Sequence, residues 1–147
     1  MTEVWAEYRG GTYHDLESEP PFHVFTRLSI GPRGFSYYSD FEVSIVSPAL
    51  VLAMLDRPGD EPEAAGFFDA VRLRESQWMT PRLFMMDVWD RESFESDIVE
   101  LCRRVSPAPS WGHLGDRLGR TLMWEQQDSY DAFTNEHHGT LYNPHLS

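Results

Sequence analysis

The chain contains no lysine, and all twelve of its basic residues are arginine. A chain without lysine has neither the lysine of a phosphate-binding P-loop nor a lysine that forms a Schiff base or acts as a general base. Enzymes that depend on any of these groups are therefore excluded.

Cysteine is almost as scarce, since Cys102 is the only one and no disulfide can form within the chain. Cys102 falls on the apolar face of a predicted helix, where we expect a buried structural thiol. The stretch from Met1 to Glu7 lacks the basic and apolar segments of a signal peptide. No apolar run approaches the ~20 residues of a membrane span. These features predict a cytoplasmic protein without a membrane segment.

Acidic residues outnumber basic ones by 24 to 12, which gives a formal net charge of −12 over 147 residues. The chain is 41% hydrophobic, enough for the core of one domain over residues 1–147. An acidic surface repels nucleic acid and anionic membranes and attracts basic protein partners. The alternative is that the charge serves only solubility.

Motifs for catalysis or metal binding are missing. None of the six histidines lies in an HExxH motif, and one cysteine cannot build a zinc finger. A hydrolase triad built on His14 and Asp15 would lack a GxSxG motif. The acid pairs, Glu125/Asp128 among them, come with no sign of the cleft that a glycosidase needs. We therefore predict no catalytic residue, no metal and no cofactor.

Alternating apolar and polar residues predict strands at residues 4–9, 22–30, 40–46, 82–89 and 122–126, the first ended by Gly10-Gly11. Residues 67–74 fit a strand or a short helix. Ser47-Pro48 begins an apolar, and so buried, helix over residues 49–55. Asp90 and Ser110 are expected to cap two more helices. Their buried stripes are Phe94, Ile98, Leu101, Cys102 and Val105, then Trp111, Leu114 and Leu118.

This order predicts an α+β fold, with an antiparallel sheet of about four to five strands and two to three helices packed on one face. Residues 131–147 are polar with few anchors, which favours a flexible tail.

Two surface segments suggest partner binding. Aromatic residues crowd the loop before residue 40, and exposed tyrosine is typical of binding hot spots, although the rings would alternatively cover the protein's own sheet. The second segment is the strand predicted at residues 122–126 and the residues after it, which are rich in acids and amides. If Trp124 faces the core, strand alternation makes Glu125 face outward. Such an acidic surface would fill a basic groove of a partner protein. The alternative is that this strand has only a structural role and closes the core. The candidate partner-binding residues are Phe35, Tyr37, Tyr38, Asp40, Glu125 and Asp128.

An ordered set of features between Phe22 and Tyr130 resembles the immunity protein 8 family: Ile30-Gly31-Pro32-Arg33-Gly34, the Phe41-Glu42-Val43 strand, Ser47-Pro48, Trp89-Asp90, Cys102, Trp111, Leu118 and Trp124-Glu125. The resemblance implies an α+β fold and a cytoplasmic, non-catalytic inhibitor of a cognate toxin in bacterial polymorphic toxin systems. The aromatic loop after Gly34 departs from the glycine- and acid-rich stretch expected there.

Three functions follow in order of preference. The first is an immunity protein that blocks a basic toxin by steric and electrostatic means. The second is a non-catalytic interaction module of unrelated purpose, and the third is a small hydrolase. A deep pocket lined by a histidine and a carboxylate of perturbed pKa would favour the hydrolase.

Overall fold

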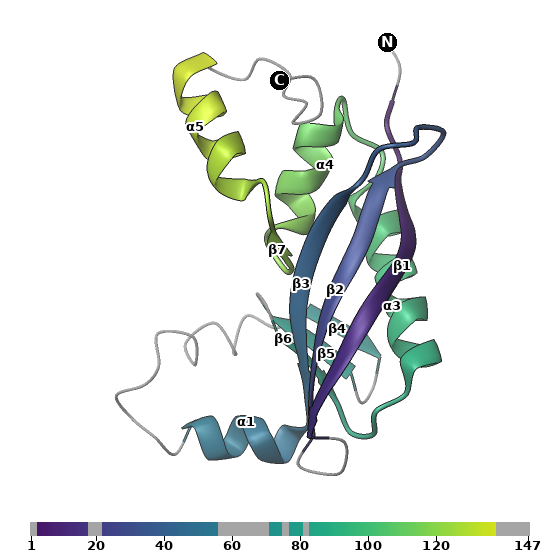
Figure 1. Cartoon of the computed structure of the whole chain (residues 1–147), viewed down its shortest axis with the longest axis vertical. Helices are drawn as coiled ribbons and strands as arrows, with labels where there is room; N and C mark the ends of the chain where they lie inside the picture. The colour runs from purple at the N-terminus through teal and green to yellow at the C-terminus, as the bar shows by residue number, and fades with distance from the viewer. Residues whose placement is uncertain (1–2, 18–21, 56–70, 75–76, 81–82, 138–147) are drawn as a thin grey trace.

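The computed structural model describes residues 3–17, 22–55, 71–74, 77–80 and 83–137 (Figure 1). The elements follow in the order β1 (Ala6–Glu17), β2 (His23–Pro32), β3 (Ser39–Val46), α1 (Pro48–Leu55), β4 (Val71–Arg74), β5 (Gln77–Thr80), β6 (Leu83–Met86), α3 (Arg91–Val105), α4 (Trp111–Leu118), β7 (Met123–Trp124) and α5 (Gln127–His137). The predicted α+β class is confirmed.

The described strands form one seven-stranded sheet in the order β1-β2-β3-β6-β5-β4, with β7 also paired to β3. Strand β3 divides one of its edges between two partners. Antiparallel β7 pairs with Phe41 and Glu42, whereas β6 runs parallel to Ser44–Val46. The other strand pairs are antiparallel. This shared edge brings Glu125, which directly follows β7, beside the start of β3.

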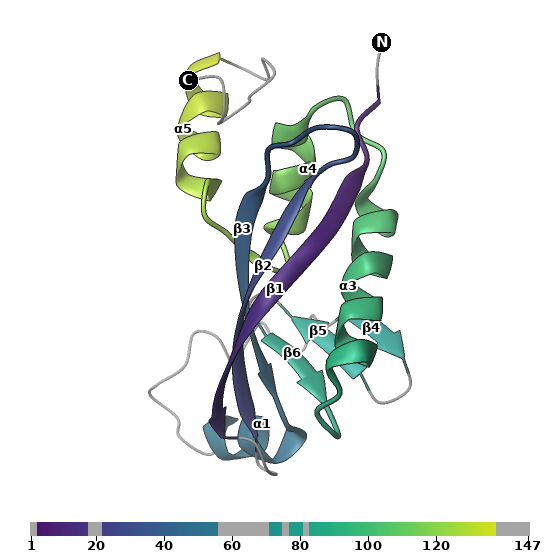
Figure 2. The ribbon, with the colours of Figure 1, turned by 45° about the vertical axis from the view of Figure 1, so that its right-hand side comes forward.

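Strands β2 and β3 bury one face and leave the other partly open. Leu28 pairs with Phe41 and Val24 with Ile45, and all four side chains are buried. Helices α3 and α4 lie behind β1, β2 and β3 in Figure 1 and cover this face, and the turned view of Figure 2 shows α3 beside β1. Their contribution to the core is the predicted stripes, namely Phe94, Ile98, Leu101, Cys102, Trp111, Leu114 and Leu118, except that Val105 is only partly buried and packs against this core.

The predicted end of the first strand at Gly10-Gly11 is wrong, because β1 continues through both glycines to Glu17. Gly10 has φ 126° and lies at a β-bulge. Such a conformation suits glycine, which lacks a Cβ atom. A Cβ atom on Gly11 would lie 3.0 Å from Cδ2 of Leu28. The two glycines therefore permit a bulge and close packing rather than a turn.

The expectation of a buried helix at residues 49–55 is also wrong in part. In α1, Val51 is buried but Leu52 is 63% exposed. The helix lies at the end of the strands rather than on the face of the sheet (Figure 1). One side of α1 thus faces away from the core, although its sequence is apolar on all sides.

Part of the expected C-terminal tail belongs to a helix. Helix α5 was not predicted, and the expected tail over residues 131–147 begins inside it. Residues 138–147 lie outside the described residues, as do residues 67–70 of the ambiguous segment. The remainder of that segment, Val71–Arg74, is strand β4.

Both predicted helix caps are confirmed. The Asp90 carboxylate accepts a hydrogen bond from the backbone N–H of Glu92 at 3.1 Å, and the Ser110 hydroxyl accepts one from that of His113 at 3.2 Å. Cys102 is buried as expected, and burial raises the pKa of its thiol to about 12. Because the thiolate is the reactive form, Cys102 is unsuited to nucleophilic chemistry.

Helix α4 packs against β7 through Gly115, and this contact predicts the effect of a small substitution. A Cβ atom there would lie 2.4 Å from Cζ2 of the buried Trp124. We expect Gly115→Ala to lower the free energy of unfolding by about 1–3 kcal/mol through overpacking, even though alanine favours a helix by ~1 kcal/mol. Urea denaturation measures the change. Gly119→Ala is the control, because its Cβ atom chiefly meets the end of the Gln127 side chain. A variant at 115 as stable as the parent would refute the tight packing.

Candidate protein interface

The loop between β2 and β3 is held by one arginine from β1. Nη2 of Arg9 donates to the carbonyl oxygens of Pro32 at 2.7 Å and Phe35 at 2.6 Å. Nη1 donates to those of Ser36 at 3.2 Å and Tyr37 at 3.1 Å. A single guanidinium thus fixes the path of the backbone from residue 32 to residue 37, which we call the aromatic tip together with residue 38.

Gly31 lets this loop fold close to β1. A Cβ atom at Gly31 would lie 2.4 Å from the carbonyl oxygen of Tyr37 and 2.9 Å from Cζ of Arg9. The turn itself uses Gly34, whose φ of 87° favours glycine. The Gly-Pro-Arg-Gly sequence therefore shapes the tip as well as ending the strand.

The tip separates the aromatic side chains that the sequence singled out. Phe35 is 54% exposed and Tyr38 is 48% exposed, whereas Tyr37 is half-buried and packs against the core. The rings of Phe35 and Tyr37 lie 5.7 Å apart. Tyr37 therefore covers the protein's own core, as one of the two alternatives expected, whereas Phe35 and Tyr38 are exposed and their contact with a partner stays a prediction.

Arg9→Lys tests how the tip is held. Lysine keeps the charge but cannot donate to all these carbonyl groups in one plane. We expect the unfolding free energy to fall by about 1–2 kcal/mol and amide exchange at Phe35 to accelerate at least about tenfold. Denaturation and hydrogen-exchange NMR measure the two effects. Arg33→Lys, an exposed change in the same loop, should stay within ~0.5 kcal/mol. Equal exchange in both variants would contradict the bracing role of Arg9.

Acidic side chains gather on the open face of the sheet directly beside the tip. The backbone N–H of Asp40 donates to Oε1 of Glu125 at 2.9 Å, and the N–H of Glu125 donates to the carbonyl oxygen of Asp40 at 3.2 Å. Glu42 forms an ion pair with Arg27 at 3.0 Å. The hydrogen bond and charge of Glu42, with smaller effects of Asp40 and Glu125, raise the pKa of Arg27. We call Asp40, Glu42 and Glu125 the acidic stripe.

Two hollows extend this surface down the open face. One of about 550 Å³ is lined by Arg9, Gly10, Gly11, Thr12, Arg27, Ser29 and Asp40. The other, of about 130 Å³, is lined by Phe25, Glu42, Val43, Ser44 and Met123. Phe25 was not predicted as part of this surface, although alternation along the strand predicted at residues 22–30 puts it on the same face as Arg27 and Ser29. Arg9 was not predicted either, because the carbonyl groups that its guanidinium contacts lie more than twenty residues away along the chain.

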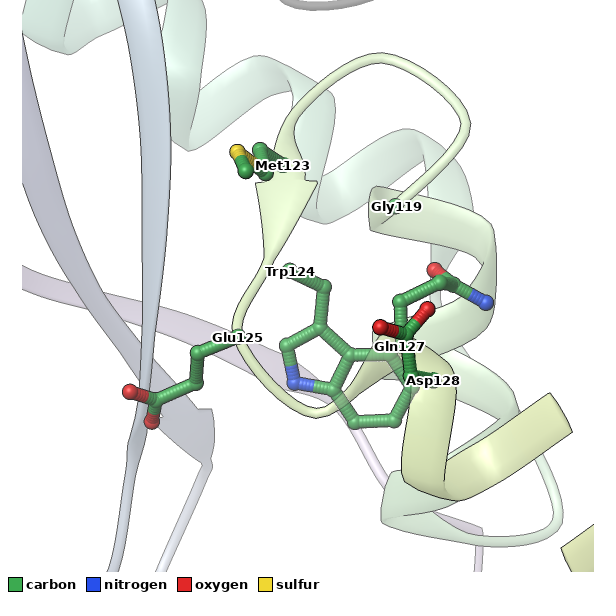
Figure 3. A pocket seen from close by; sticks show the side chains of 6 residues that line it. All are labelled: Gly119, Met123, Trp124, Glu125, Gln127 and Asp128. Carbon is green, nitrogen blue, oxygen red and sulfur yellow. The ribbon is translucent and has the colours of Figure 1, made fainter. Parts of the chain in front are cut away.

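Asp128 does not belong to the acidic stripe. It lies on α5 and lines a third hollow of about 220 Å³ with Gly119, Met123, Trp124, Glu125 and Gln127 (Figure 3). The structure therefore brings Asp40 and Glu125 together in the acidic stripe and places Asp128 in the third hollow. Glu125 belongs to both the stripe and this hollow.

The described residues contain no cluster of three or more metal-ligating side chains. They also contain no helix long and apolar enough to cross a membrane. None of the three hollows above is lined by histidine. The Ser110 hydroxyl lies 2.7 Å from Nδ1 of His113, but that hydroxyl is also the cap of α4. The contact is accounted for by helix capping.

No family model, no curated protein and no solved structure matches this chain.

Proposed function

We propose that this protein is an immunity protein that binds a basic bacterial toxin in the cytoplasm and blocks its active surface. The observation that supports this most is a braced tip with two exposed aromatic side chains, Phe35 and Tyr38, continuous along the chain with the acidic stripe that begins at Asp40. Rigid aromatic anchors beside steering charges are the elements that a tight, fast-associating inhibitor needs.

The bracing by Arg9 has a direct energetic consequence for binding. A loop that must be ordered on association costs about 0.5–1.5 kcal/mol for each immobilised side chain. Because Arg9 already fixes the backbone that carries Phe35, part of this cost is met in the free protein. We therefore expect little movement of the tip when the complex forms.

The test is protection from a toxin. The protein is expressed together with the toxin domain that this proposal expects to be encoded beside its gene, and growth, pull-down and toxin activity are measured. We expect protection by the wild type and loss of protection when Phe35 and Tyr38 are both alanine. Binding without protection would instead support the second candidate, an interaction module of unrelated purpose, which the same surface would serve.

Salt dependence separates steering from anchoring. Exposed charges act over a Debye length of ~10 Å at 0.1 M salt, so the acidic stripe should influence approach more than release. Between 50 mM and 500 mM salt we expect the association rate to fall by roughly tenfold or more and the dissociation rate to change by less than about twofold. Stopped-flow kinetics with the toxin provide both rates.

Removing charge from the stripe should reproduce part of this effect. Asp40→Asn with Glu42→Gln should lower the association rate, whereas Glu92→Gln, an exposed acid on α3, should not. An association rate insensitive to salt would remove the steering role of the stripe.

A further inference from the structure

Arg33 is a cation without a counter-charge on a strongly acidic protein. The residue is exposed in the aromatic tip, and its guanidinium forms no ion pair or hydrogen bond with any other described residue. Every other arginine whose side chain is described contacts a carboxylate or a backbone carbonyl oxygen, as Arg27 does with Glu42 at 3.0 Å. Carboxylates are plentiful in a chain with a net charge of −12, yet Arg33 keeps its N–H donors available to a partner.

Trp5 positions the Arg33 side chain. Cζ of Arg33 lies 5.5 Å from the centroid of the Trp5 ring, which is within the range of a cation–π interaction. The backbone N–H of Arg33 also donates to the carbonyl oxygen of Trp5 at 2.8 Å, so the segment before β1 lies beside the tip (Figure 2). Trp5 is still 36% exposed. Because the pair is arranged in the free protein, less side-chain entropy is lost when a partner binds.

The pair lies on the open face of the sheet, which is the face that carries the acidic stripe. Ala6 is buried in the core, so alternation along the extended chain directs Trp5 to the opposite face. Phe35, which is exposed, follows Arg33 closely in the tip, and the acidic stripe begins at Asp40 just after the tip ends. The surface therefore has a positive, aromatic end and a negative end.

We infer that Arg33 binds the carboxylate of an aspartate or glutamate side chain of a protein partner, while apolar residues next to that acid pack on the exposed rings of Trp5 and Phe35. A guanidinium donates two parallel hydrogen bonds to a carboxylate, which fixes geometry as well as charge. The phosphates of nucleic acid are a poor alternative, because the net charge of −12 repels them. An acid opposite the tip and bases opposite the acidic stripe set the orientation of the complex. That the partner is a toxin rests on the proposed function, but the carboxylate contact does not.

The probe is a phage-displayed library of short random peptides, selected on the full chain. General attraction to an acidic protein would enrich basic residues alone. We expect in addition an aspartate or glutamate at one fixed position beside an apolar residue. This acid should disappear from the selected peptides when Arg33→Gln is the target. It should persist with Arg120→Gln, which removes the same charge from an exposed arginine beside Asp116.

A double-mutant cycle with one selected peptide tests the contact itself, with fluorescence anisotropy as the measurement. Arg33→Gln, and replacement of the peptide's acid by its amide, should each weaken binding at least about fivefold. The two changes together should weaken it no more than either one alone, because both remove the same interaction. Arg33→Lys should bind more tightly than Arg33→Gln and more weakly than the parent, since lysine keeps the charge but not the planar pair of donors.

Trp5 is tested as a positioning residue. Trp5→Phe keeps an aromatic face and should retain the affinity within about twofold, whereas Trp5→Leu, which is apolar without such a face, should lower it roughly threefold or more. In the Arg33→Gln background the difference between phenylalanine and leucine should vanish, which a merely structural role of the ring does not predict. Urea denaturation confirms that each variant is folded.

The inference is overturned if no peptide is selected, if no acid is enriched, if Arg120→Gln loses the acid as Arg33→Gln does, or if the two changes of the cycle act independently. These outcomes are separable from those of the proposed function. Peptides with an acid that depends on Arg33, from a protein that gives no protection from the toxin, would establish the contact and refute the immunity role. A toxin bound equally well by Arg33→Gln, with no acid enriched in the library, would leave the immunity role and refute the contact.

Discussion

Leu118→Ala is expected to lower the free energy of unfolding by about 2–5 kcal/mol, the usual range for truncating a buried leucine. Leu118 ends α4 and is fully buried in the core beneath the sheet. It also anchors the chain that leads into β7, since the backbone N–H of Leu122 donates to its carbonyl oxygen at 2.8 Å. Removing the side chain leaves a cavity between the helix and the sheet that neighbouring groups fill only partly.

Chemical denaturation measures this loss, and Leu52→Ala is a closely matched control. Both changes remove the same atoms from a helix, but Leu52 is exposed on α1, so its loss should cost less than about 0.5 kcal/mol. Similar losses at the two positions would show that α4 is not packed as described.

Local chemistry explains what the sequence could predict. Asp90 and Ser110 cap helices through their own side chains, and the apolar spacing from Phe94 to Leu101 identifies the buried face of α3. Alternation alone identified the buried side of β3. Each of these features depends on residues a few positions apart, and a single sequence displays such short-range patterns directly.

Features that depend on distant segments were not predictable. Nothing near Arg9 indicates that its guanidinium meets carbonyl groups between residues 32 and 37. Gly10-Gly11 has the composition of a turn, and only pairing with β2 shows that it is a bulge. The apolar sequence of α1 predicted burial, but the position of the helix at the sheet's end leaves Leu52 exposed. In each case the local sequence is compatible with more than one conformation or degree of burial, and contacts with distant segments decide which one forms.

The candidate interface likewise combines short-range features that the sequence displays with long-range contacts that it does not. Exposed aromatics and acids were visible in the sequence, but their grouping was not. The pairing of β7 with β3 joins Glu125 to Asp40, 85 positions away, and leaves Asp128 in a separate pocket. Burial likewise distinguishes Tyr37, which supports the core, from Tyr38.

This distinction defines the variant with the largest expected effect on binding. Replacing Phe35 and Tyr38 together by alanine removes the exposed rings, among them the Phe35 ring that contacts Tyr37, but keeps Tyr37 itself and the bonds of Arg9, which go to backbone oxygens. If these rings are anchors, we expect a loss of about 2 kcal/mol or more, equivalent to roughly 30-fold in the dissociation constant. The loss should appear mainly as faster dissociation, since packed anchors govern release.

Surface-capture kinetics with the toxin at fixed ionic strength measure both rates. The control removes two exposed apolar side chains elsewhere, Leu52→Ala with Val88→Ala, and should leave both rates unchanged. Thermal unfolding of the tip variant should stay close to that of the parent, because its targets are solvent-exposed. An unchanged dissociation rate would place the tip outside the interface. A slower association rate with unchanged release would instead assign the aromatic rings to the encounter step, and the anchor would have to lie elsewhere on the acidic face.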